Sequence, residues 1–193
     1  MATYAVLDFE TTGMSPGQGA CATEIGIVLV RDGAIAERFQ SLMNGGVRLS
    51  SFIENYTGIT NAMVRKAPPI QEVMAQACAF VGHHPLVAHN ASFDTKFWDA
   101  GLQAIGQERR QDFLCSVRLS RRVFSNLTNH RLGTMVQSLN LPMSGNFHRA
   151  LADAEATAHL FIRLQAEIKA KLKLEEVTLQ HMQAVQRLKI GTF

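Results

Sequence analysis

The pair Asp32-Gly33 constrains the fold of this chain more than any other feature, because it lies between two runs with the pattern of β-strands. An Asp-Gly pair in that position is a strong signal for a tight hairpin, since the turn needs residues that tolerate a left-handed backbone. The flanking runs, residues 24–31 and 34–42, are therefore predicted to pair as antiparallel strands. Another apolar run, residues 4–10, predicts a strand near the start of the chain.

The second half of the sequence alternates between strand and helix patterns. Short strands are expected over residues 85–89 and 113–117. Helices are expected over residues 71–80, 92–104 and 131–139, and from residue 150 into the 170s. Strand–helix–strand units that follow a hairpin predict an α/β domain, in which helices flank a mixed sheet.

The composition changes after about residue 165, where Lys and Gln become frequent and no Pro or Gly occurs before Gly191. This segment predicts a helical extension with a weak apolar stripe. The stripe consists of Leu174, Val177, His181, Ala184 and Leu188. The extension either folds back on its own domain or contacts a partner protein or a second copy. We therefore expect a main domain over residues 1–165 and a helical tail over residues 166–193.

Composition excludes several classes of protein. Apolar residues make up 47% of the 193 residues, which is enough for a buried core and argues against disorder. No apolar run approaches the roughly 20 residues that a membrane helix needs, and the first residues lack the pattern of an export signal. The three cysteines, Cys21, Cys78 and Cys115, form neither a disulfide framework nor a zinc motif. We therefore expect a cytoplasmic protein without membrane contact.

The strongest chemical signal is the acidic pair at the end of the first predicted strand. Alternate residues of a strand share a face, so Asp8 and Glu10 point to one side while Leu7 and Phe9 point to the other. No Lys or Arg occurs in the first 30 residues to neutralise the two carboxylates. A divalent cation such as Mg²⁺ or Mn²⁺ would resolve their repulsion. An exposed acidic pair at a strand end explains these residues about as well.

A second acidic motif follows the predicted strand at residues 85–89. The chain passes through His89 and Asn90 into a helix, which places Asp94 in the first turn, where the helix dipole favours negative charge. Ligands of open α/β sheets bind at the carboxyl ends of the strands. Asp94 and the pair Asp8 and Glu10 both lie at such ends. An ordinary first-turn acid also explains Asp94 taken alone.

The third motif contains His148 and Asp153. Five residues of regular helix turn through about 500°, so the two side chains converge only if His148 precedes the helix. The pair Gly145-Asn146 supports that placement. A histidine on a mobile lip suits general-base catalysis, because imidazole titrates near neutrality. A capping or surface histidine beside a solvated acid is the alternative interpretation.

An arginine-rich segment separates the second and third motifs. It contains Arg109, Arg110, Arg118, Arg121, Arg122 and Arg131. Over the whole chain 19 Lys and Arg face 16 Asp and Glu, so the formal charge is +3. Because the guanidinium fork binds two phosphate oxygens at once, we interpret the segment as a track for a polyanionic strand. A solvated helix face is the alternative.

The three acidic motifs, in this order and spacing, resemble the DEDDh 3′–5′ exonucleases. This family includes the proofreading (epsilon) subunit of bacterial DNA polymerase III and stand-alone enzymes. The matching segments are Asp8-Phe-Glu10-Thr-Thr-Gly, His89-Asn-Ala-Ser-Phe-Asp94 and His148-Arg-Ala-Leu-Ala-Asp153, with accessory matches at residues 22–26 and 57–60. The resemblance covers roughly residues 3–164, and chance does not readily produce so many ordered matches.

The resemblance implies a ribonuclease H-like fold and a defined set of site residues. The ligands of two divalent metal ions, Mg²⁺ or Mn²⁺, would be Asp8, Glu10, Asp94 and Asp153. His148 would be the general base. The residues that meet the substrate would be Thr11, Thr12, Gly13, Met14, Asn90 and Phe93. The implied reaction releases nucleoside 5′-monophosphates from the 3′ end of single-stranded or frayed DNA.

Two alternative functions stay open. An exoribonuclease would apply the same chemistry to RNA 3′ ends, whereas a catalytically silent nucleic-acid-binding scaffold would keep only the fold. The complete set of acids with His148 speaks against a silent scaffold, and the pair Thr11-Thr12 resembles DNA-directed family members. The tail matches no family motif. Its contact with a polymerase or with a second copy, and the oligomeric state, are therefore left open.

Overall fold

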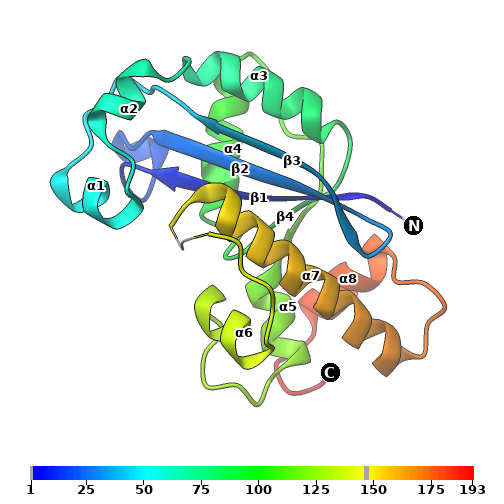
Figure 1. Ribbon diagram of the computed structural model, residues 1–193. Helices are drawn as coiled ribbons and strands as arrows, with labels where there is room; N and C mark the ends of the chain where they lie inside the picture. Colours follow the sequence, from blue (N-terminus) through cyan, green and yellow to red (C-terminus); the bar gives the residue numbers. More distant parts are fainter. Residues whose placement is uncertain (1, 146–147) are drawn as a thin grey trace.

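A five-stranded mixed sheet forms the centre of the computed structural model, which describes residues 2–145 and 148–193 (Figure 1). Its strands are β1 (Tyr4–Thr11), β2 (Ala22–Arg31), β3 (Ala34–Leu42), β4 (Leu86–Ala88) and β5 (Phe113–Cys115). Their order across the sheet is β3-β2-β1-β4-β5. The first three strands pair antiparallel, while β4 pairs parallel with both β1 and β5. The predicted hairpin and mixed α/β sheet are confirmed.

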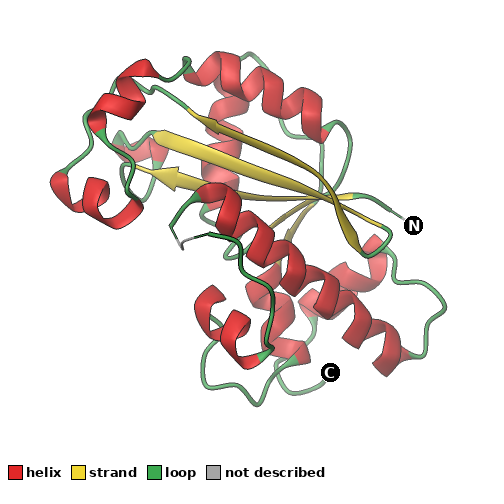
Figure 2. Cartoon of the chain, viewed as in Figure 1, coloured by secondary structure: helices red, strands yellow, loops and turns green. Residues whose placement is uncertain are grey.

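Helices cover both faces of this sheet (Figure 2). They are α1 (Ser51–Thr57), α2 (Asn61–Lys66), α3 (Ile70–Val81), α4 (Asp94–Ala104), α5 (Ser116–Val123), α6 (Leu132–Ser138), α7 (Ala150–Leu172) and α8 (Leu179–Arg187), with a short 3₁₀ turn at Pro16–Gln18. Among the residues that the structure describes, none of the helices combines the length and the apolarity that crossing a membrane requires.

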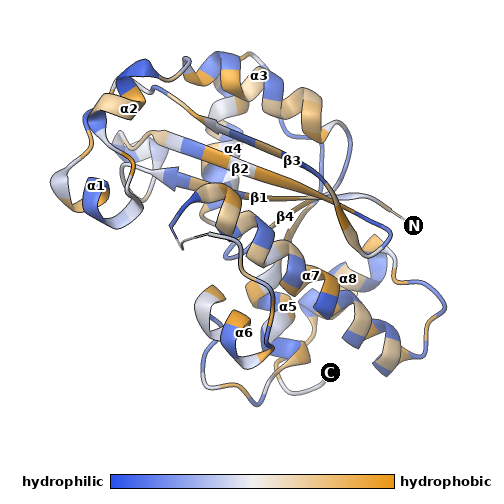
Figure 3. Ribbon diagram, viewed as in Figure 1, coloured by the Kyte–Doolittle hydropathy of each residue, from blue (hydrophilic) through white to orange (hydrophobic). Residues whose placement is uncertain are grey.

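Side chains of β1 alternate between two separate hydrophobic clusters. Leu7 and Phe9 pack with α3 and α4 on one face, whereas Tyr4 and Val6 pack with α7 on the other. Both faces are buried, so the strand is apolar until its carboxyl end. In Figure 3 the colouring of β1 becomes hydrophilic at its arrowhead, which is where the acidic pair lies. The fold therefore brings the acids to the edge of a closed core.

Several elements differ from the sequence prediction, which gave no helix over Ser116–Val123. The strand expected over residues 113–117 ends at Cys115, because Ser116, Leu119 and Ser120 form the buried side of α5 at helical spacing. Helices α1 and α2 were not predicted. They have only seven and six residues, and the side chains of Ser50 and Thr60 cap their amino ends. Helices this short carry too little periodicity to be recognised.

The tail is helical, as predicted, but its helical residues are divided between α7 and α8. Helix α7 ends where Lys173 adopts a left-handed backbone, with a φ of 53°. The buried side chains of α8 are Met182 and Val185. The predicted stripe instead contained their neighbours, His181 and Ala184, and was wrong at these positions. The break between the two helices resets the helical phase, so a stripe counted across it fails.

Helix α8 packs against its own domain. Met182 and Val185 join the hydrophobic cluster that contains Val6 and Phe161, and the helix lies against α5 and β5 (Figure 1). This contact favours the fold-back interpretation of the tail. The division into residues 1–165 and 166–193 stays a prediction.

Candidate active site

The acidic pair on β1 faces the start of α7. In the register with β2, Asp8 lies opposite Gly26 and Glu10 lies opposite Glu24. The two acids continue the face of β1 whose earlier members, Tyr4 and Val6, pack against α7. They point to the same side of the sheet, with Leu7 and Phe9 on the other side.

Gly26 lets α7 begin directly on the sheet. A Cβ at this position would overlap backbone atoms of Ala150 and Leu151, so only glycine permits the observed approach. The first turn of α7 carries Asp153, which is buried. Close packing at Gly26 therefore brings this acid toward the acidic pair on β1.

Glu24 anchors the same helix by hydrogen bonds. Its carboxylate accepts bonds from Arg149 Nε and a terminal nitrogen of Arg149 at 3.0 and 2.7 Å, and from the Ala150 backbone N–H at 3.0 Å. Gln40 Nε2 donates another bond at 2.7 Å. Glu24 is fully buried. The sequence prediction gave Glu24 no role, although an acid within the apolar run of residues 22–30 was a signal.

Asp94 reaches the site from the neighbouring parallel strand. The chain leaves β4 through Asn90, whose φ is 72°, and Asp94 is the first residue of α4. The side chain is 1% exposed. Its Oδ1 atom has no hydrogen-bond partner among the described residues. Such an orphaned buried oxygen is rare in proteins and suits a position beside a cation.

His148 precedes α7 and lies beside its first turn. The residue adopts a left-handed backbone, with a φ of 67°, and its N–H donates to Asp153 Oδ2 at 2.9 Å. The other oxygen, Asp153 Oδ1, is buried without a partner in the described residues. Ligand atoms of Glu10, His148 and Asp153 all lie within 4.8 Å of one another. Asn146, whose pairing with Gly145 supported this placement, lies outside the described residues.

Burial raises the pKa of all four acids, and the charges of neighbouring acids add to the effect at Asp8 and Glu10. Burial, followed by the charge of Asp94, holds the pKa of Asp8 well above its usual range, and Asp153 and Glu10 add to the effect. Burial raises the pKa of Glu10 to about 8 and that of Asp94 to about 7. The pKa of Asp153 is also raised by burial. Carboxylates that cannot all ionise together fit a divalent cation, which would compensate their charge.

Asp8 and Asp94 interact electrostatically with the other acids but stand outside the tight group of Glu10, His148 and Asp153. All four predicted acids therefore lie in one neighbourhood. Three of the predicted site residues, Glu10, His148 and Asp153, are close enough to one another to bind the same metal ion. Their catalytic and metal-binding roles stay predictions.

The turn after β1 is held by its own hydroxyl groups. Thr11 Oγ1 donates to the Gly13 carbonyl at 2.7 Å, and Thr12 Oγ1 accepts from the Cys21 N–H at 2.9 Å. Met14 follows with 72% of its surface exposed. An exposed apolar side chain on an ordered turn is available to a ligand. Its predicted contact with a terminal nucleotide stays a prediction.

The other two predicted substrate residues lie in the turn before α4. Asn90 is exposed, and its backbone carbonyl accepts the Phe93 N–H at 2.9 Å. Phe93 is half-buried, and its ring lies 5.0 Å from that of Phe97 between centroids. Phe93 therefore contributes to the core, and its predicted role beside the substrate stays open.

His89 has a structural role that the sequence did not reveal. Its Nδ1 lies 2.9 Å from Ser116 Oγ, and its Nε2 lies 2.9 Å from the His130 carbonyl oxygen. Burial lowers the pKa of His89 to about 4, so the ring is neutral near pH 7 and Nε2–H donates to the carbonyl. The ring thus ties the turn before α4 to α5 and to the segment before α6.

The arginine-rich segment divides into two groups. Arg109 pairs with Asp99 at 2.8 Å, and Arg122 donates to the Leu188 carbonyl at 2.9 Å. The remaining four, Arg110, Arg118, Arg121 and Arg131, are exposed. At least two arginines therefore serve the fold, and a phosphate track through the others stays a prediction.

Comparisons with known proteins identify the class. The sequence pattern of the family described as "Exonuclease" matches residues 5–161. DNA polymerase III PolC-type of Bacillus cereus is 38% identical over 167 residues, which are 86% of this chain and 12% of that protein. The PolC-type protein of Caldanaerobacter subterraneus is 32% identical over 192 residues, 97% of this chain and 14% of that protein. The chain thus spans only a small part of these relatives.

Solved structures agree with this match. Exonuclease X in complex with 5′-overhanging duplex DNA superposes with a TM-score of 0.75 at 26% identity, over 95% of this chain and 99% of that one. The nuclease domain of 3′hExo, a DEDDh family member bound to rAMP, gives a TM-score of 0.72 over 91% of this chain and 96% of that one, and its 20% identity shows the fold alone.

The chain belongs to the exonuclease family, with a ribonuclease H-like fold. The predicted resemblance to DEDDh 3′–5′ exonucleases and the enzyme class are confirmed.

Proposed function

We propose that this chain is a metal-dependent exonuclease that releases nucleoside 5′-monophosphates from DNA 3′ ends, with His148 as general base. One observation carries the proposal. Asp94 and Asp153 each bury a carboxylate oxygen without a hydrogen-bond partner in the described residues, within one acidic neighbourhood. Buried oxygens of this kind destabilise a protein unless a ligand compensates them.

The donor set suits divalent cations. Asp8, Glu10, Asp94 and Asp153 offer hard carboxylate oxygens, as Mg²⁺ and Mn²⁺ prefer. These residues would hold two ions. When bound, a pair of divalent ions supplies Lewis-acid stabilisation of the attacking and leaving oxygens of a phosphodiester. The raised pKa values of Glu10 and Asp94, about 8 and about 7, are consistent with a site built around compensating positive charge.

His148 supplies the proton acceptor. Its backbone is fixed to Asp153, and a ring nitrogen lies within 4.8 Å of carboxylate oxygens of both Glu10 and Asp153. From this position the imidazole would take a proton from the attacking water. Thr11, Thr12, Gly13 and Met14 would orient the terminal nucleotide beside it, and Asn90 and Phe93 would line the same pocket.

DNA is the favoured substrate class. Exonuclease X, which matches nearly the whole chain, is seen with duplex DNA, and the PolC-type relatives are DNA polymerases by name. The runner-up is RNA, because the structurally similar 3′hExo domain is seen with rAMP. Contact of the tail with a polymerase or a second copy stays a prediction.

The test measures mononucleotide release from a 5′-labelled single-stranded DNA with Mg²⁺ or Mn²⁺. Asp94→Asn is expected to lower the rate at least about 100-fold, because the buried acid is proposed to hold the metal. Asp99→Asn is the matched control, since Asp99 lies on the same helix but pairs with Arg109. A rate of Asp94→Asn within a few-fold of the parent would contradict the metal assignment. A fully active His148→Ala would remove the histidine from the mechanism.

The substrate class needs a parallel comparison. Single-stranded DNA, RNA of the same sequence and a duplex DNA with a mismatched 3′ end are digested under one metal and salt condition. Faster cleavage of DNA, and of the frayed end over a matched duplex, is expected. Faster cleavage of RNA would instead favour the exoribonuclease.

A further inference from the structure

Three aromatic rings lie in a row beside the acidic cluster. The ring centroids of Tyr56 and His148 are 3.9 Å apart with an interplanar angle of 32°. Phe52, one helical turn earlier, stacks on Tyr56 at 5.8 Å with an angle of 11°. Phe52 is 70% and Tyr56 51% exposed, so neither ring serves the hydrophobic core. The row connects the surface of α1 with the histidine at the start of α7.

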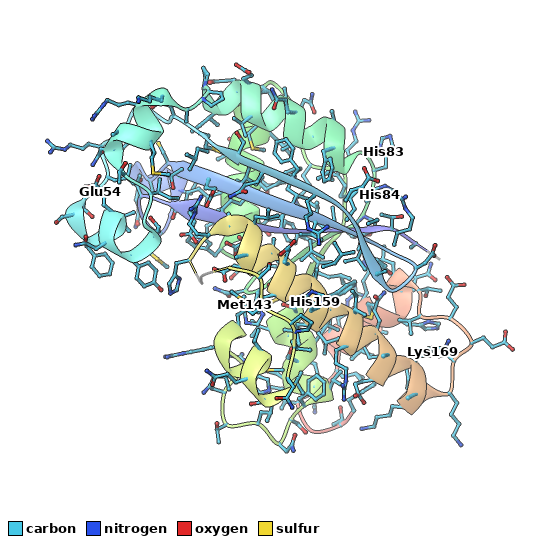
Figure 4. All side chains as sticks on the ribbon, viewed as in Figure 1. Glu54, His83, His84, Met143, His159 and Lys169 are labelled. Carbon is cyan, nitrogen blue, oxygen red and sulfur yellow. The ribbon has the colours of Figure 1, made fainter. Side chains whose placement is uncertain are left out.

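Helix α1 is a firm support for this row. The side chain of Asn61 accepts from the Leu49 N–H at 2.9 Å and donates to the Leu49 carbonyl at 3.0 Å, which closes the segment on itself. Glu54 Oε1 accepts the Asn61 N–H at 2.6 Å. Leu49, Ile59 and Val64 form a small core beneath. Figure 4 marks Glu54 on α1 at one end of the sheet, with His83 and His84 at the other end.

His148 needs such a support. It lies outside the helix, with a left-handed backbone that non-glycine residues seldom adopt. Its N–H is bonded to Asp153, but that bond fixes the backbone and leaves the rotation of the ring free. Stacking on Tyr56 restricts this rotation, since the ring can turn only by losing the contact.

We infer that Tyr56 is a positioning residue, which holds the His148 imidazole over the acidic cluster and is itself backed by Phe52. The inference rests on the proposed function, because it assigns to Tyr56 an effect on the general base. Tyr56 is not assigned a contact with substrate. Its ring is already engaged with the rings of His148 and Phe52, and the kinetic test below separates positioning of His148 from contact with substrate.

A double-mutant cycle tests the inference. Tyr56→Ala is expected to lower kcat about tenfold with little change in KM, because the base loses its orientation while the substrate contacts stay. Tyr56→Phe keeps the ring and is expected to remain within about twofold of the parent. Phe52→Ala removes only the backing ring and is expected to have a smaller effect than Tyr56→Ala. Asn55→Ala, at an exposed position of the same helix, is the matched control.

The decisive arm introduces Tyr56→Ala into His148→Ala. If Tyr56 acts through His148, the second substitution is expected to change the residual rate less than about twofold. An equal loss in both backgrounds would overturn the inference, as would a raised KM with unchanged kcat, which would indicate substrate contact. Thermal unfolding of each variant excludes loss of fold as the cause. Failure of the proposed function is distinguishable, because it would appear as full activity of His148→Ala alone.

Discussion

Glu24 differs from Asp94 and Asp153 in its hydrogen bonding, although all three are buried acids of one small region. Glu24 on β2 accepts bonds from Arg149, from the Ala150 N–H and from Gln40. Asp94 and Asp153 each keep a buried oxygen without a partner in the described residues. Glu24 therefore has the bonding pattern of a structural acid. Asp94 and Asp153 instead have the pattern expected of acids that bind a cation.

This contrast shows how an acidic site can be kept in a stable fold. Mutual repulsion of carboxylates weakens a protein, and the first turn of α7 carries one of them. Glu24 offsets this weakness by binding the amino end of the same helix, where backbone N–H groups need acceptors. One acid thus fixes the element that presents another. Substitution of Glu24 should therefore lower the free energy of unfolding, whereas neutralising an acid of the proposed metal site should raise it.

The largest effect is expected at Glu24. Glu24→Ala leaves Arg149 and the first turn of α7 without their acceptor, and the free energy of unfolding should fall by about 3–5 kcal/mol. Urea denaturation measures the loss. Glu37→Ala is the matched control on the neighbouring strand, because Glu37 forms a half-exposed ion pair with Arg31 and should lose less than about 1 kcal/mol. Equal losses in the two variants would remove the distinction between Glu24 and the acids of the proposed metal site.

A smaller loss is expected where α7 touches the sheet. Gly26→Ala forces the backbone of Ala150 and Leu151 away from β2, and the free energy of unfolding should fall by about 1–3 kcal/mol. Activity should fall as well, because Asp153 moves with the helix. Gly17→Ala is the control, since its Cβ would meet only Ser15 Oγ at 3.8 Å, an ordinary contact. A Gly26→Ala variant with parental stability and rate would show that the close approach is not needed.

The acids of the proposed metal site were predicted from the sequence, whereas the structural role of Glu24 was not. Asp8 and Glu10 were recognisable because the two-residue period of a strand places them on one face, and that information is local. The fold class followed from the hairpin and the strand–helix order in the same way. Glu24 looked like an interruption of an apolar strand, because its partner Arg149 is 125 residues away. Contacts of Gly26 with α7 and of Tyr56 with His148 likewise depend on distant segments, which no local pattern encodes.

The smallest expected effect has the opposite sign and is found at Glu10. In the folded chain burial raises its pKa from 4.5 to about 8, so the metal-free folded state holds a proton that the unfolded state has released between these values. The free energy of unfolding should therefore decline as the pH rises from about 5 to 8. Below this pH range, ionisation of Glu10 does not lower the stability of the fold. Glu10→Gln carries no charge and should be more stable than the parent at pH 8, by about 1–2 kcal/mol.

This gain should shrink toward zero as the pH falls below 4.5, because Glu10 is then protonated in both states, and the pH comparison therefore serves as an internal control. Added Mn²⁺ should stabilise the parent more than Glu10→Gln, because a ligand that binds only the folded state raises its stability. Denaturant unfolding at several pH values, with and without Mn²⁺, measures all of these quantities. If Glu10→Gln were less stable than the parent at pH 8 without metal, Glu10 would belong with Glu24 among the structural acids. The contrast with Glu24 would then rest only on Asp94 and Asp153, whose buried oxygens have no partner among the described residues.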